Sequence, residues 1–356
     1  MTNERQAPFP WFGGKSRAAA LIWERLGEVK NYVEPFAGSL AVLLGSPRVA
    51  NIETVNDLDG FIANFWRALA QHPEEVAEYA DWPVNENDLS ARHAWLVQRR
   101  EELQSRLEGD PEFCDTKIAG WWVWGLCCWI GSGWCSGKGP WHVVDGKLVR
   151  EPQHAGTGSN RVLPNLGNAG MGVSRKRPHL GNAGMGVNRQ RPHLGDAGMG
   201  VHRQLPLLEW FEALATRLRR VRVCCGDWSR VLGPSPTTTL GLTGVVLDPP
   251  YDTSMRCDSC YSVDAQGLSA KVREWAIEHG DDPKMRIALC GYEGEHEMPS
   301  TWSVVSWKAL GGYSNRSASG RGRANSFKER VWFSPHCLKI HVQEQEQVEE
   351  AQLSCL

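Results

Sequence analysis

Two stretches of the chain alternate short apolar runs with amphipathic runs, and this alternation limits the fold more than any other feature. Short apolar runs predict buried strands, and apolar residues spaced three or four apart predict helices. The predicted elements, in order, are a helix at 16–26, strands at 31–34 and 48–55, helices at 59–70, 90–107 and 208–220, strands at 221–224 and 245–247, a helix at 269–279, and strands at 285–290, 302–309 and 330–333. Strands alternating with helices predict an α/β fold, a Rossmann-like doubly wound sheet with helices on both faces. The last two strands predict a C-terminal antiparallel hairpin.

A stretch without this alternation, residues 81–205, separates the two parts. It contains the block WWVWGLCCWIGSGWCSGKGPW at 121–141 and a three-fold repeat with a period of 14 residues between about 165 and 205. The simplest organisation is one catalytic domain made of residues 1–80 and 206–340, with residues 81–205 inserted into it. Residues 341–356 contain four glutamates and predict a solvated acidic tail.

The overall composition is that of a globular protein. The chain has 356 residues, of which 41% are hydrophobic and 22% charged, enough for a large core and more than one domain. No apolar run approaches the roughly 18 residues that span a bilayer, and the polar start is unlike a signal peptide. The 11 cysteines are odd in number and irregularly spaced, which favours reduced thiols. We therefore expect a cytoplasmic protein without a membrane partner, and a monomer is compatible with the sequence.

The formal net charge of −2 hides a basic stretch inside the insert. Each unit of the repeat places basic side chains after a glycine-rich turn, a pattern suited to phosphate contacts. These predicted DNA-binding residues are Arg175, Lys176, Arg177, Arg189, Arg191 and Arg203. The alternative is a flexible linker that grew by duplication. The tryptophan block likewise has two interpretations, since its rings could fill a core or stack on unpaired bases.

The run Asp248-Pro249-Pro250-Tyr251 follows the predicted strand at 245–247 directly. The prolines fix the backbone and remove two N–H donors, which leaves rigid carbonyls at the end of a strand. A carboxylate and a fixed carbonyl can accept hydrogen bonds from the exocyclic NH2 of a base, and the ring of Tyr251 can stack on it. Taken alone, the same four residues could form a proline-rich turn.

A second candidate site follows the first strand, at Glu34-Pro35-Phe36-Ala37-Gly38. Open α/β sheets bind nucleotides at the carboxyl ends of their strands. Asp57 ends the next strand, where an acid can accept hydrogen bonds from ribose hydroxyls. The competing interpretation of Asp57 is a helix cap in a structural turn.

Two further motifs are incomplete. Gly13-Gly14-Lys15-Ser16 resembles the end of a phosphate-binding loop, but Phe9 stands where that loop needs glycine. Cys257-Asp258-Ser259-Cys260 could be half of a zinc site, although no second pair follows at usable spacing. We therefore expect no bound metal and favour incidental or buried thiols.

Taken in order, these motifs resemble the Dam-like (D12 class) DNA adenine N6-methyltransferases, and phage or prophage members in particular. The resemblance rests on Phe12-Gly13-Gly14-Lys15, Glu34 to Gly38, Asn56-Asp57, the large insert, Gly226-Asp227 and Asp248 to Tyr251. It covers about residues 8–70 and 206–335. It implies methyl transfer from S-adenosyl-L-methionine to adenine N6 in double-stranded DNA, with base flipping and target recognition by the insert.

The resemblance also implies roles for individual residues. The cofactor would be bound by Trp11, Gly14, Lys15, Glu34, Pro35, Phe36, Gly38, Asp57 and Asp227, and the catalytic residues would be Asp248, Pro249, Pro250 and Tyr251. Arg316-Ser317 and Arg330-Val331 resemble the closing hairpin. Ser39 stands where the family often has a further glycine, and the insert does not resemble a compact helical recognition domain. A cytosine-N4 or RNA methyltransferase and a non-catalytic DNA-binding protein remain as alternatives.

Overall fold

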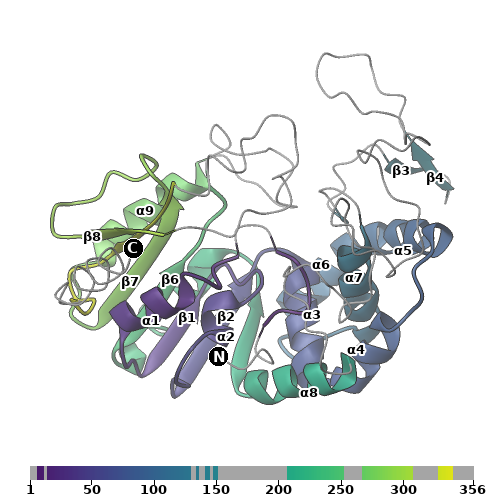
Figure 1. Cartoon of the computed structure of the whole chain (residues 1–356), viewed down its shortest axis with the longest axis horizontal. Helices are drawn as coiled ribbons and strands as arrows, with labels where there is room; N and C mark the ends of the chain where they lie inside the picture. The colour runs from purple at the N-terminus through teal and green to yellow at the C-terminus, as the bar shows by residue number, and fades with distance from the viewer. Residues whose placement is uncertain are drawn as a thin grey trace, which may run out of the picture.

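A seven-stranded sheet runs through the middle of the protein, with helices packed along it (Figure 1). The computed structural model describes residues 6–11, 14–129, 134–135, 141–144, 147–150, 207–251, 267–307 and 328–339. The order of the strands in the sheet is β5-β2-β1-β6-β7-β9-β8. The chain begins in the centre of the sheet, builds outward to one edge, and then returns to the centre to build the other half. The carboxyl ends of β1 and β6 therefore meet at the point where the strand order reverses.

Five neighbouring strands are parallel, and the last two close the sheet as an antiparallel hairpin. The parallel strands are β1 (Asn31–Glu34), β2 (Ile52–Asp57), β5 (Val221–Cys225), β6 (Thr243–Leu247) and β7 (Met285–Tyr292), and the hairpin is β8 (Ser303–Ser306) with β9 (Glu329–Phe333). The predicted α/β fold, a Rossmann-like sheet with a terminal antiparallel hairpin, is confirmed. A separate antiparallel pair, β3 (Trp141–Val144) and β4 (Lys147–Arg150), lies beside α5.

Helices occupy most of the remaining described chain. They are α1 (Ala19–Leu26), α2 (Ala41–Leu44), α3 (Gly60–Gln71), α4 (Pro73–Ala80), α5 (Glu86–Gln98), α6 (Arg100–Gly109), α7 (Thr116–Cys128), α8 (Leu207–Leu218) and α9 (Leu268–His279), with short 3-10 turns η2 (Trp228–Val231) and η3 (Thr238–Leu240). No helix in these described parts is long and apolar enough to cross a membrane.

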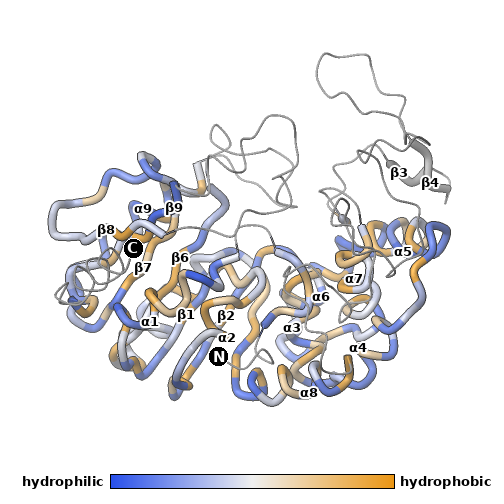
Figure 2. Tube along the Cα trace, viewed as in Figure 1, coloured by the Kyte–Doolittle hydropathy of each residue, from blue (hydrophilic) through white to orange (hydrophobic). Residues whose placement is uncertain are grey.

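Both faces of the sheet are buried at its central strands, where successive residues enter different cores. Val245 and Leu247 of β6 pack with α9, whereas Val246 packs with α1 on the opposite face. Apolar residues run along the central strands, while the helices alternate between apolar and polar positions (Figure 2). This is the pattern of a parallel sheet covered on both sides.

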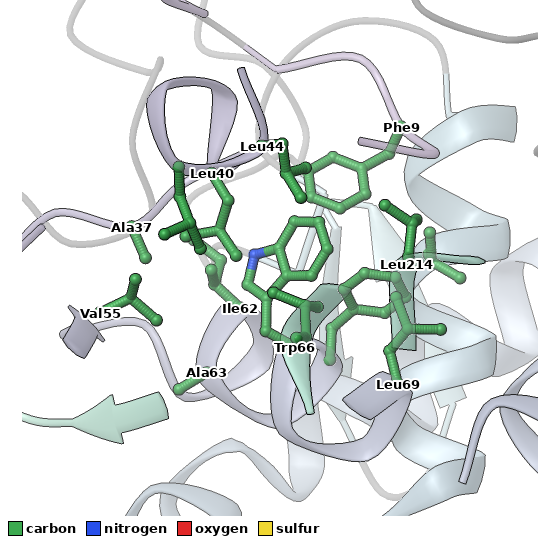
Figure 3. Close-up of a cluster of buried hydrophobic side chains, with 14 of the residues drawn as sticks. Phe9, Ala37, Leu40, Leu44, Val55, Ile62, Ala63, Trp66, Leu69 and Leu214 are labelled. Carbon is green, nitrogen blue, oxygen red and sulfur yellow. The ribbon is translucent and has the colours of Figure 1, made fainter. Parts of the chain in front are cut away.

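The larger core extends from the sheet into the insert. Trp66 of α3 lies in its centre, between Phe9, Leu40, Leu44 and residues of α3 and α8 (Figure 3). Residues of α5, α6 and α7 belong to the same buried cluster. The described part of the insert thus packs on the sheet domain through a shared core, and the domain boundaries at 80 and 206 stay a prediction.

The tryptophan block supplies core residues where the structure describes its side chains. Trp122, Trp124 and Trp134 are buried. The indole N–H of Trp134 donates to the carbonyl of Trp122 at 3.0 Å. These three rings are therefore part of the protein core.

Two predicted helices differ from those observed. The first begins at Ala19 rather than Ser16, and no side chain caps it. The helix predicted at 90–107 is two helices that meet at Arg99, whose ψ is 0°. The break lets Leu103 and Leu107 of α6 enter the core beside α3 while α5 packs on α7. The predicted strand at 48–55 is also shifted and occupies Ile52–Asp57.

Candidate active site

Three turns that leave neighbouring strands form the candidate site. The register pairs Glu34 at the end of β1 with Val55 of β2, and Val33 with Val245 of β6. The residues that follow these strands are therefore brought to one edge of the sheet. They include the loop at 34–38, Asp57 and the Asp248–Tyr251 tetrapeptide, as the sequence predicted.

The loop after β1 is built around Gly38, which has a φ of +45°. A Cβ at this position would lie 2.5 Å from the indole nitrogen of Trp11, so a side chain could not be accommodated without displacing Trp11. The Gly38 carbonyl accepts a hydrogen bond of 2.8 Å from the indole of Trp66 in the core. The hydrogen bond from Trp66 of α3 thus fixes the position of the loop, and Trp11 packs against the loop.

Asp57 is fixed by the same loop. Its carboxylate accepts hydrogen bonds of 2.9 Å from the backbone N–H groups of Gly38 and Asp59, one on each oxygen. Each oxygen has a second lone pair, so the group can still accept hydrogen bonds from a ligand. Burial raises the pKa of Asp57 to about 7, although both backbone N–H groups act in the opposite direction.

Asn56 joins the loop to the turn after β5. Its side-chain NH2 donates to the carbonyls of Pro35 at 3.1 Å and Gly226 at 2.9 Å. Its side-chain oxygen is buried and has no hydrogen-bond partner among the described residues. Asp227 follows this turn, is exposed, and caps η2 through the N–H of Ser229 at 3.0 Å. Three strands therefore contribute polar atoms to one small region.

Glu34 is a buried carboxyl beneath the loop. It is 4% exposed and accepts a hydrogen bond of 2.9 Å from the hydroxyl of Tyr32. Burial raises the pKa of Glu34 from 4.5 to about 8, and the negative charges of Asp248 and Asp57 act in the same direction. Glu34 is therefore largely protonated at neutral pH.

The raised pKa of Glu34 predicts a measurable pH dependence of stability. Between pH 4.5 and about 8 the folded protein holds a proton that the unfolded chain has lost, so the free energy of unfolding falls as the pH rises. Glu34→Gln stays neutral and should exceed the wild type in unfolding free energy at pH 8 by roughly 2–5 kcal/mol, at about 1.4 kcal/mol per pKa unit. The two should converge near pH 4.5. Urea titrations at several pH values measure this.

The control for that titration is Glu28→Gln, because the side chain of Glu28 is 82% exposed. It should leave the pH dependence of the wild type unchanged. Parallel pH profiles for Glu34→Gln and the wild type would show that Glu34 is ionised in the folded protein.

Lys15 and Asp248 form an ion pair at the end of β6. The ammonium nitrogen of Lys15 lies 2.8 Å from one oxygen of Asp248, and the lysine side chain is only 4% exposed. The same ammonium lies 5.0 Å from the centre of the Tyr251 ring and 5.8 Å from that of Trp307. The sequence assigned Lys15 to the cofactor, and the structure brings it to the tetrapeptide.

The remaining predicted residues surround these groups. Pro35 and Pro249 are buried, Pro250 is half-buried, and Gly14 is half-buried beside Ser39. Phe36 stacks on Trp228 with ring centres 6.2 Å apart. The predicted DNA-binding residues between 175 and 203, the Cys257–Cys260 pair and Arg316-Ser317 lie outside the described residues.

The sequence did not indicate two contacts of Tyr251. Its hydroxyl donates to a carboxylate oxygen of Glu329 at 3.0 Å, and its ring meets that of Tyr292 edge-on at 4.5 Å. Glu329 and Tyr292 face each other in the β7–β9 register. The glutamate that begins the run Glu329–Phe333 is the sequence signal that could have revealed these contacts. A charged residue in a buried strand needs a partner.

The N-terminal part of the chain is similar to known DNA methyltransferases. Residues 11–110 match the family of D12 class N6 adenine-specific DNA methyltransferases. A protein of Escherichia phage P1 named DNA N-6-adenine-methyltransferase is 29% identical over 100 residues, which are 27% of this chain and 13% of the phage protein. The chain therefore covers a small part of that relative. These findings confirm the predicted resemblance: over residues 11–110 the chain matches the D12 class N6 adenine-specific DNA methyltransferase family.

Proposed function

We propose that this protein transfers a methyl group from S-adenosyl-L-methionine to N6 of adenine at a specific site in double-stranded DNA. The observation that supports this most directly is the Lys15–Asp248 ion pair, which lies at the carboxyl edge of the sheet together with the 34–38 loop. The family match covers the loop and Asp57 but ends before the tetrapeptide. The geometry therefore supplies the link between the two halves of the proposed site.

The residues around the loop fit a nucleoside-containing cofactor. Gly38 has no side chain, which lets Trp11 lie directly against the loop, and the carboxylate of Asp57 keeps lone pairs for ribose hydroxyls. The unpartnered oxygen of Asn56 is a further buried acceptor in this region. Trp11, Glu34, Phe36 and Asp227 would complete the cofactor site. When bound, S-adenosyl-L-methionine supplies a methyl group activated by its positive sulfur.

Asp248 would hold the amino group that receives the methyl. The N6 nitrogen of adenine is a weak nucleophile, because its lone pair is delocalised into the ring. A carboxylate oxygen of Asp248 and the carbonyl of Pro249 can accept its two N–H groups and orient the nitrogen towards the methyl donor. Lys15 occupies one oxygen of Asp248, so the other oxygen is left for the amino group.

The base must leave the duplex to reach this site, at a cost of a few kcal/mol. Tyr251 would then stack on the flipped adenine. The Tyr251 ring is 4% exposed, and the ammonium of Lys15 lies over it. A base stacked on this ring would take the place that the ammonium of Lys15 occupies over it.

Methylation-aware sequencing of DNA from cells that express the protein tests the function. We expect N6-methyladenine in one recurring sequence context, absent from cells without the protein. Methylation of cytosine N4 instead of adenine N6 would show that the protein is a cytosine-N4 methyltransferase. Methylation of RNA instead of DNA would show that it is an RNA methyltransferase. DNA binding without any methyl transfer would favour a non-catalytic DNA-binding protein.

We propose that residues 81–205 form the target-recognition region and that its basic repeats contact the DNA phosphates. We also propose that the enzyme is cytoplasmic. Replacing Arg175, Lys176 and Arg177 together with alanine should weaken DNA binding and reduce the slope of log K against log salt by about 0.9 per lost contact. Binding titrations between low and moderate salt measure this slope. Arg219 and Arg220, exposed after α8, are the control pair for a nonspecific loss of positive charge. An unchanged slope in the triple variant would mean that the repeat is a linker.

A further inference from the structure

Tyr251 is anchored by the last strand of the sheet. Tyr251 and Glu329 are each 4% exposed, and the hydroxyl of Tyr251 donates to Glu329 at 3.0 Å. Glu329 begins β9, which pairs with β7 and places Tyr292 directly opposite. Tyr292 meets the Tyr251 ring edge-on at 4.5 Å. The ring of the tetrapeptide is thus held at its hydroxyl by β9 and at its side by β7.

This anchor matters because the backbone alone does not fix the ring. The prolines before Tyr251 restrict the main chain, whereas its side chain can still rotate about two bonds. A hydrogen bond to the ring tip removes that freedom. Glu329 is also a costly residue to bury, since a carboxyl taken out of water needs a partner. Tyr251 supplies one, and the positive charge of Lys15 is a second source of stabilisation.

We propose that Glu329 is a positioning residue for methyl transfer, acting through its hydrogen bond to the hydroxyl of Tyr251. It orients the ring on which the flipped base stacks, and it takes no part in binding the methyl donor. This inference rests on the proposed function. The relevant property is an acceptor oxygen at the end of this side chain, which glutamine also provides.

Two variants of similar volume separate this role from simple packing. Glu329→Gln keeps an acceptor oxygen, and Glu329→Leu fills the space without one. We expect Glu329→Leu to lower kcat about tenfold or more and Glu329→Gln to stay within about threefold of the wild type. Binding of S-adenosyl-L-methionine, measured by calorimetry, should change less than about twofold in both. Equal losses of kcat in the two variants, or none in Glu329→Leu, would overturn the proposal.

A double-variant cycle tests whether Glu329 acts through Tyr251. Tyr251→Phe removes the hydroxyl and keeps the ring. If the proposal is correct, adding Glu329→Leu to Tyr251→Phe causes little further loss of kcat, because the hydrogen bond is already absent. A loss in the double variant equal to the product of the two single losses would contradict it. Glu293→Gln is the matched control, since its side chain is 63% exposed and it pairs with the neighbouring Arg330.

The two proposals fail in different ways. If the wild type transfers no methyl group to adenine in DNA, the proposed function is wrong. The same variants then test the anchor alone by their melting temperatures, where Tyr251→Phe and Glu329→Leu should again be non-additive. If the wild type is active and Glu329→Leu equals it, only the role of Glu329 is rejected.

Discussion

Replacing Asp248 with alanine is expected to abolish methyl transfer while binding of S-adenosyl-L-methionine is retained. The variant loses the carboxylate that would orient the amino group, whereas the loop at 34–38 and Asp57 stay in place. Losing one oriented hydrogen-bonding group at a reacting centre typically costs about 10²–10³ in kcat, and losing the orientation of the nucleophile adds to this. Transfer of a labelled methyl group to DNA measures the first effect, and calorimetry measures the second.

Controls for this variant follow from its surroundings. Asp248 pairs with the buried Lys15, so its loss should also lower the melting temperature, which must be measured beside activity. Asp281→Ala removes an exposed carboxylate from the turn before β7 and should leave both measurements at wild-type values. Near-normal methylation by Asp248→Ala would refute the assignment of the tetrapeptide.

Replacing Arg217 with alanine is expected to cost about 3–5 kcal/mol of folding stability, the typical cost of breaking a buried ion pair. Arg217 of α8 donates two hydrogen bonds to Glu53 of β2, of 2.6 and 2.8 Å, and a third of 3.2 Å to the carbonyl of Leu43. Both charged side chains are almost fully buried. The variant would leave the Glu53 carboxylate without this partner in the core. Denaturant unfolding measures the loss.

The exposed Arg219, directly after this helix, provides the control, since Arg219→Ala should change stability by less than about 0.5 kcal/mol. A double variant, Arg217→Met with Glu53→Leu, should recover most of the stability, because apolar residues of similar volume remove the buried charges together. A loss from Arg217→Ala as small as that from Arg219→Ala would show that the pair is dispensable.

The sequence predicted the sheet well because its strands are short apolar runs flanked by helices. The strand at 31–34 and the hairpin strands were placed within a few residues of β1, β8 and β9. The prediction from the sequence failed where tertiary packing decides the end of a helix. The break at Arg99 follows from the need of α5 and α6 to bury different faces, which the local pattern of charges does not reveal.

The candidate site was predictable as a set of residues but not as a set of contacts. The loop at 34–38, Asp57 and Asp248 follow strands, and parallel strands bring such residues to one edge. Lys15 has no strand before it, so its motif suggested only the cofactor. Its contact with Asp248 joins residues that are far apart in the sequence and is a property of the folded protein.

The alternation of strands and helices could be predicted from the amino-acid sequence, and so could the residues at the carboxyl ends of the strands. These are local properties, since apolar spacing, glycine and proline act through the nearest part of the backbone. The folded structure was needed to show that Lys15 pairs with Asp248, that Arg217 pairs with Glu53 and that Glu329 anchors Tyr251. Each of these pairs joins distant parts of the chain in a buried place, where a charged or polar group is stable only beside a partner that folding brings to it.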